Sequence, residues 1–140
     1  MEITDKYPYF EGIAPSGYVK LDDKKISPDV EHLIIGLTGD CMDSDLSPIR
    51  IRHGDKLLIH FVPIKESEII KNIGKVIAFK YSNDVIYTKQ LVSYSKNYIL
   101  IRLFKPHEKF FYVPINKIKA LFVVDDVISP EYIKQNLYKI

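Results

Sequence analysis

Cys41 is the residue with the clearest capacity for chemistry. It is the single cysteine of the 140 residues and lies in the stretch GLTGDCMDSD at positions 36–45. A thiol attacks as its thiolate, so a nucleophilic cysteine needs either a lowered pKa or a neighbouring base. The stretch alone leaves three interpretations open: a nucleophile, a buried structural thiol, or the remnant of a lost catalytic site.

Lys89 is the candidate base. It lies within IYTKQL at positions 86–91, where strand alternation places Tyr87, Lys89 and Leu91 on one face. A lysine can accept a proton if burial keeps it neutral. A lysine inside an apolar strand also costs desolvation energy unless it is paired or exposed at an edge. The other interpretation is therefore an edge-strand lysine that discourages aggregation.

Metal and cofactor chemistry is not indicated by spacing. The four histidines are His32, His53, His60 and His107, and no two are four residues apart as in a helical zinc motif. One cysteine adds little to such a ligand set, so we expect no metal site. The glycine-rich phosphate-binding patterns are absent from the sequence, so no cofactor is expected.

Composition narrows the class of protein. Twenty basic and 18 acidic residues give a net charge of +2, too balanced for the domain as a whole to bind nucleic acid. No apolar run reaches the length of a membrane span, and the N-terminus lacks the pattern of a signal peptide. A lone cysteine cannot form an internal disulfide, which favours a reducing compartment. We therefore expect a cytoplasmic protein without membrane contact.

The elements that must position Cys41 and Lys89 are mostly strands. Short runs rich in Ile, Val and aromatic residues, bounded by turn-forming residues, predict strands at 32–37, 56–62, 75–81, 85–92, 98–103 and 120–124. The turn at 82–84 makes 75–92 a hairpin, and 64–72 is either one helical turn or a loop. At the end of the chain, Ser129 is a candidate helix N-cap and Pro130 suits the first helical position.

These patterns predict a mainly β fold with a short C-terminal helix, in three parts. Residues 1–29, with prolines and glycines, are expected to be an extended arm outside the core. Residues 30–128 form the β domain, and residues 129–140 form the helix.

Several motifs resemble the LexA-like, or peptidase S24, family. The most specific are GDCM at 39–42 and IRHGDKLLI at 51–59, similar to the family's G-D-S-M and I-x-x-G-D patterns. Weaker similarities follow in the family's order: GKVIA at 74–78, YTKQL at 87–91, LFKPHEKFFYVPI at 103–115 and ALFVV at 120–124. The resemblance covers about residues 30–128.

The resemblance implies a β-rich, signal-peptidase-like fold that is commonly dimeric. It implies a serine–lysine dyad, with Cys41 at the serine position and Lys89 at the lysine position. Backbone N–H groups of Asp40 and Cys41 would form the oxyanion hole. The family cuts its own chain upstream of the dyad, and the nearest match to such a bond is Ser16–Gly17. DNA would be contacted through a separate helix-turn-helix domain or a partner.

The sequence also departs from the family's pattern. Cysteine replaces serine, the segment 43–50 is longer than the family usually allows, and Pro15 precedes the candidate bond. We therefore expect a regulatory or oligomerisation domain, phage-repressor-like or UmuD-like, with weak or no self-cleavage. Two alternatives stay open: an active autoprotease with a Cys41–Lys89 dyad, and a thiol-based redox sensor in which oxidation of Cys41 alters dimerisation.

Overall fold

The protein is mainly β, as predicted. The computed structural model describes residues 6–11, 14–21, 31–36 and 41–139. Their strands join in one sheet: β1 (Lys6–Glu11), β2 (Ala14–Lys20), β3 (His32–Gly36), β4 (Lys56–Val62), β5 (Val76–Tyr81), β6 (Ile86–Ser95), β7 (Tyr98–Leu103), β8 (Lys109–Pro114), β9 (Ile118–Ile128) and β10 (Leu137–Lys139). Two short helices accompany them, α1 (Glu66–Lys71) and α2 (Pro130–Asn136), with a 3-10 turn at Ile115–Lys117. None of the helices described is long and apolar enough to cross a membrane.

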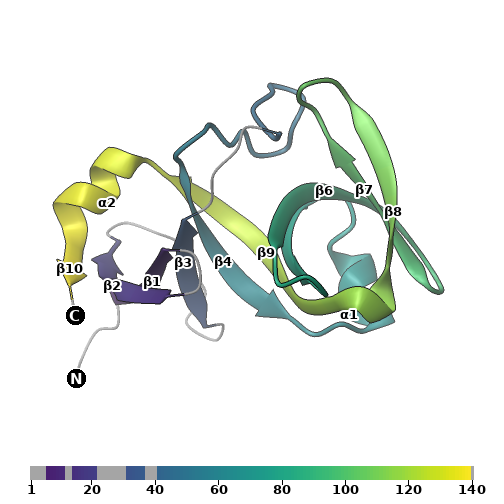
Figure 1. The fold of residues 1–140 in the computed structure, drawn as a ribbon, viewed down its shortest axis with the longest axis horizontal. Coiled ribbons are helices and arrows are strands. Elements are labelled where there is room, and N and C mark those ends of the chain that lie inside the picture. The colour runs from purple at the N-terminus through teal and green to yellow at the C-terminus, as the bar shows by residue number, and fades with distance from the viewer. Residues whose placement is uncertain (1–5, 12–13, 22–30, 37–40, 140) are drawn as a thin grey trace.

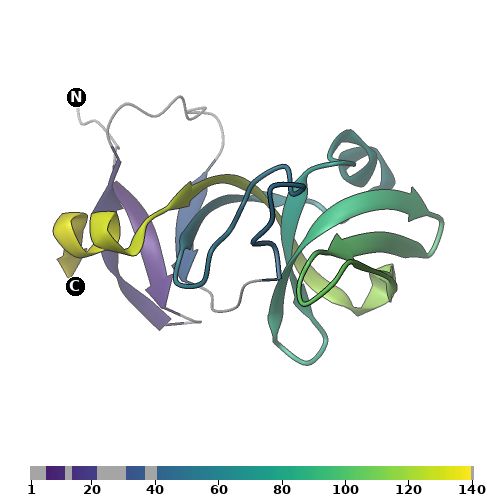
Figure 2. The same ribbon diagram turned by 90° about the horizontal axis from the view of Figure 1, so that it is seen from above.

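The strand order divides the molecule into two ends. The order across the sheet is β10-β2-β1-β3-β4-β9-β5-β6-β7-β8. Figure 1 shows β1 to β3, β10 and α2 at one end, and β5 to β8 curling round with α1 at the other. The long strand β9 runs between the two ends beside β4, and Figure 2 shows the same division from above. β9 therefore connects the two ends of the sheet, because it pairs with β4 on one side and with β5 on the other.

The N-terminal segment is extended, as predicted, but it belongs to the core. β1 and β2 form an antiparallel hairpin, and β1 also pairs in parallel with β3. Tyr9, Val19 and Leu21 are buried in a hydrophobic cluster with Ile34. Alternating apolar side chains give these strands a face to bury, so the expectation of an arm standing outside the core is wrong.

The predicted local signals near the end of the chain are confirmed. The Ser129 side chain accepts a hydrogen bond from the Tyr132 N–H at 3.2 Å, and Pro130 begins α2. The helix ends at Asn136, earlier than the predicted 140, and β10 then pairs with β2. The hairpin predicted at 75–92 forms as β5 and β6, and the segment 64–72 contains α1.

Two other hydrophobic clusters fill the rest of the sheet. One lies among β4 to β9 and contains Phe79, Leu91 and Val123. The other contains Met42, Ile51 and Leu57, with Cys41 packed against it. The second cluster buries Met42 and Ile51, the residues on either side of the 43–50 segment, beside Cys41.

Candidate functional site

The structure brings Cys41 and Lys89 together. The Lys89 Nζ is 3.1 Å from the Cys41 Sγ and can donate a hydrogen bond to it. The sulfur is also 3.4 Å from the backbone carbonyl oxygen of Thr88, toward which its S–H can point. Both side chains are half-buried. A thiol in direct contact with an amine is the arrangement that proton transfer between them requires.

Lys89 is not on an edge strand. β6 lies between β5 and β7 in the sheet, and Lys89 pairs with Ile77 across β5. The interpretation of Lys89 as a charge that protects a sheet edge is therefore wrong. Its face of the strand is the predicted one: Tyr87 and Lys89 line a pocket together, and Leu91 is buried in the cluster beyond it.

The backbone holds Cys41 in place from both sides. Its carbonyl oxygen accepts hydrogen bonds from the N–H groups of Phe104 and Lys105, at 2.8 and 3.1 Å. The next residue, Met42, is 1% exposed, and its carbonyl accepts from Ile51 N–H at 3.1 Å. Cys41 is thus fixed between the end of β7 and the base of the following loop.

Ion pairs between residues of the same loop connect the two ends of the loop at 43–50. The Arg50 Nε donates to Asp43 at 2.6 Å, and its Nη1 donates to Asp45 at 2.7 Å. The hydrogen bond from Arg50 lowers the pKa of the Asp43 carboxyl and raises the pKa of Arg50 itself. Asp43 also lies 3.5 Å from the Lys105 Nζ. The segment 43–50 is therefore an organised loop beside the thiol.

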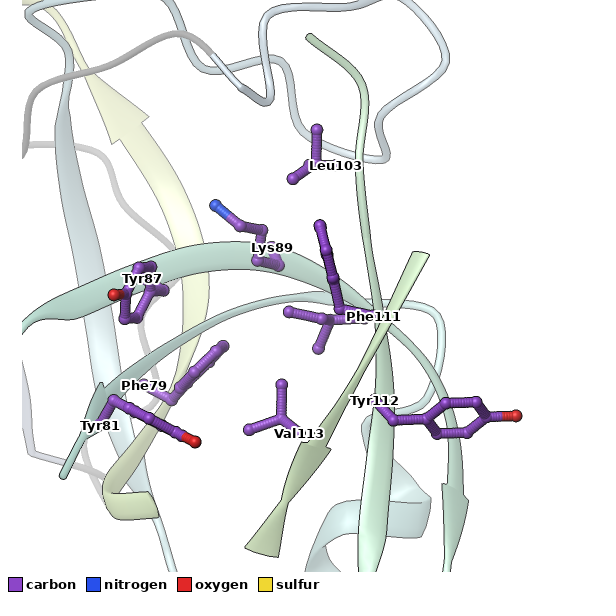
Figure 3. A pocket seen from close by; sticks show the side chains of 9 residues that line it. Phe79, Tyr81, Tyr87, Lys89, Leu103, Phe111, Tyr112 and Val113 are labelled. Carbon is purple, nitrogen blue, oxygen red and sulfur yellow. The ribbon is translucent and has the colours of Figure 1, made fainter. Parts of the chain in front are cut away.

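An apolar pocket of about 350 Å³ opens beside Lys89. Figure 3 shows Lys89 and Tyr87 rising from one strand, Phe111 and Val113 opposite them, and the Tyr112 ring extending away. The wall is mostly aromatic and aliphatic, formed by Phe79, Tyr81, Tyr87, Lys89, Ile101, Leu103, Phe111, Tyr112 and Val113. Such a pocket suits an apolar side chain of a bound molecule.

Sequence reasoning missed the residues that support the site. Thr88 and Phe104 act through backbone groups, which leave no mark on residue type. Arg102 places its guanidinium 4.4 Å from the centroid of the Phe104 ring and forms an ion pair with Glu108. The charges of Arg50 and Asp43 were visible in the sequence, but their pairing depends on how the loop folds.

The other predicted site residues lie elsewhere or outside the described residues. Asp40, predicted to contribute to the oxyanion hole, is not among the residues that the structure describes. Ser16 and Gly17, the predicted cleavage site, lie within β2, where Gly17 pairs with Tyr9 of β1 and with Lys139 of β10. β1, β3, β4, β9 and β5 lie between β2 and β6 in the sheet order. The structure thus does not bring Ser16–Gly17 together with Lys89.

The sequence was also compared with known proteins. No family model matches it. No curated protein matches it significantly either. The geometry of the site and the motif resemblance are therefore the two observations that bear on function.

Proposed function

We propose that the protein is a LexA-like domain of the S24 type in which Cys41 and Lys89 form a nucleophile–base dyad for peptide bonds. The observation that carries this proposal is the 3.1 Å contact between the Cys41 Sγ and the Lys89 Nζ. The two residues occupy the positions at which the family has its serine and its lysine. The mainly β fold and the interior position of β6 are consistent with the proposal.

The chemistry would be acyl transfer. When its amine is deprotonated, Lys89 takes the proton of the Cys41 thiol, and the sulfur forms a bond to the peptide carbonyl carbon. The tetrahedral intermediate then expels the amine of the scissile bond, which receives that proton from Lys89. Water attacks the resulting thioester with Lys89 again acting as base, which releases the acid product and the Cys41 thiol.

The substrate would be an extended peptide with an apolar side chain. The pocket beside Lys89 is lined mainly by apolar side chains and lies on the same face of β6 as the amine. An apolar side chain inserted there would place the neighbouring peptide bond near the dyad, and this positioning lowers the barrier to attack.

The test is the reactivity of the thiol in the full chain. Alkylation of Cys41 by iodoacetamide near neutral pH, followed by mass spectrometry, should be faster than alkylation of free cysteine. Lys89→Met should slow it, whereas Lys96→Met, at an exposed lysine, should leave it unchanged. A Cys41 thiol that reacts no faster than free cysteine would count against the dyad.

A second proposal is that the domain is a regulatory or oligomerisation module that does not cut itself. The observation that favours it is the position of Ser16–Gly17 within β2, where Gly17 pairs with Tyr9 of β1 and with Lys139 of β10. A peptide bond in that position cannot enter a protease site unless β2 leaves the sheet. Incubation of the full chain at alkaline pH tests the proposal: efficient cutting at Ser16–Gly17 that Cys41→Ala abolishes would overturn it.

A further inference from the structure

A cluster of two imidazoles and a carboxylate lies away from the dyad. The Asp125 Oδ2 is 2.6 Å from the His60 Nδ1 and 3.0 Å from the His32 Nε2. The two imidazole rings are 5.4 Å apart between centroids. The three ligand atoms all lie within 4.8 Å of one another. Two nitrogen donors and one oxygen donor thus converge on one point.

Three strands build this cluster. His32 of β3 and His60 of β4 are directly opposite in the antiparallel register. Asp125 comes from β9, where Leu58 faces Asp126 and Ile59 faces Val124, so that Asp125 is the extra residue of a bulge. A bulge re-aims a side chain relative to the regular strand. Here it directs the carboxylate toward the two histidines.

The cluster extends from the interior to the surface, because His32 is buried, His60 is half-buried and Asp125 is exposed. His32 is 7% exposed, and the side chains of His60 and Asp125 are 23% and 31% exposed. Along β4, His60 lies between Leu58 and Val62, which belong to two different hydrophobic clusters. Packing on both sides of His60 therefore positions its imidazole beside the carboxylate before any ligand is present.

We propose that His32, His60 and Asp125 form a binding site for a divalent first-row transition metal, with Zn²⁺ the best fit. In a tetrahedral zinc site with bonds of about 2.0 to 2.2 Å, the ligand atoms are roughly 3.3 to 3.6 Å apart. The two distances to the carboxylate oxygen are 2.6 and 3.0 Å, so a small separation of the side chains would admit the ion. Imidazole nitrogens and one carboxylate favour zinc or iron over calcium or magnesium.

Three protein ligands leave a coordination position open to water or another ligand. The bound metal would also join β3, β4 and β9, which lie next to one another at the middle of the sheet. Because the three ligands come together in the folded chain, the metal would bind the folded state preferentially and stabilise it. This proposal is independent of the proposed peptidase chemistry.

Binding is tested with Co²⁺ as an absorbing substitute and Zn²⁺ as competitor, on the full chain without a polyhistidine tag. Wild-type protein should bind one Co²⁺ per chain, with visible absorption that Zn²⁺ removes. Asp125→Asn and His60→Ala should weaken binding at least about tenfold. His107→Ala, at an exposed histidine, and Cys41→Ser should leave affinity unchanged.

A Kd above about 1 mM for Co²⁺ binding to the wild-type protein would overturn the proposal. The proposal would also fail if Asp125→Asn and His60→Ala bound Co²⁺ as tightly as the wild type does. A further measurement avoids any variant that fails to fold. Imidazole NMR signals of the wild-type chain, titrated with Zn²⁺, should shift at His32 and His60 and stay unchanged at His53 and His107. Shifts confined to His53 or His107 would contradict the site.

Discussion

The dyad and the histidine–carboxylate cluster are assembled in different ways. Cys41 lies in a loop and Lys89 on a strand, and their contact depends on backbone hydrogen bonds from Phe104 and Lys105. His32, His60 and Asp125 all lie on strands of the middle of the sheet, fixed by strand register and one bulge. A residue on a loop, such as Cys41, needs hydrogen bonds to neighbouring segments to fix its position. A site on paired strands is positioned by the sheet itself.

The largest expected effect is at the dyad. Replacing Lys89 with Met should lower any peptidase activity, measured with apolar peptide substrates, by about 10² to 10⁴-fold, because the base is lost. Cys41→Ala should remove the activity altogether. Zinc affinity should be the same in both variants, and a loss of zinc binding on Lys89→Met would show that the two sites are not separate.

The next effect concerns the support of the loop. Met42→Ala should lower the free energy of unfolding by about 2 to 5 kcal/mol, because Met42 is 1% exposed within a hydrophobic cluster. Urea denaturation measures it, with Leu46→Ala as the control, since Leu46 is 72% exposed in the same loop. A change no larger than that of the control would mean that the loop does not depend on its buried end.

Zinc binding at His32, His60 and Asp125 should raise the free energy of unfolding, whereas no such effect is expected from the dyad. A 100-fold excess of Zn²⁺ over its Kd should add about 2.7 kcal/mol to the stability of wild-type protein. Thermal unfolding should show a raised midpoint, and the rise should shrink in Asp125→Asn. An equal rise in both proteins would place zinc binding elsewhere in the chain.

The smallest effect is the dependence of the loop on pH. The pKa of Asp43 is lowered in the folded protein, chiefly by the hydrogen bond from Arg50. Its contribution is therefore present above the unfolded-state value of about 3.9 and is lost as pH falls from there through the lowered folded-state pKa. Asp43→Asn should remove this dependence, by a small amount at an exposed pair. A stability difference between wild type and variant that is constant from about pH 6 to about pH 2 would contradict it.

Local signals made much of the fold predictable. The 75–92 hairpin and the Ser129 cap follow from short-range turn and capping chemistry, and both are present. The expectation of an N-terminal arm outside the core is wrong, because β1 pairs with β3 and β2 pairs with β10, a strand from the other end of the chain. Pairing between remote strands depends on the whole sheet, which no short stretch encodes.

The two sites differ in the same way. Cys41 and Lys89 could be proposed from residue type, strand alternation and motif resemblance, and the structure places them in contact. His32 and His60 were both noted in the sequence, but linear spacing gave no reason to join them. The two histidines lie opposite each other only because of the β3–β4 register, and Asp125 reaches them only because of the bulge in β9. The spacing of residues in the sequence predicts neither feature.

The position of β9 has a consequence for newly synthesised chains. β3 and β4 are joined to β5 through β9, which comes late in the sequence. Cys41 follows β3 and Lys89 lies on β6, so the two residues of the dyad come from opposite sides of β9 in the sheet. During translation both residues leave the ribosome well before residues 118–128, and the thiol and amine should meet stably once β9 has emerged. An unfinished chain would then carry the thiol and the amine without the contact between them.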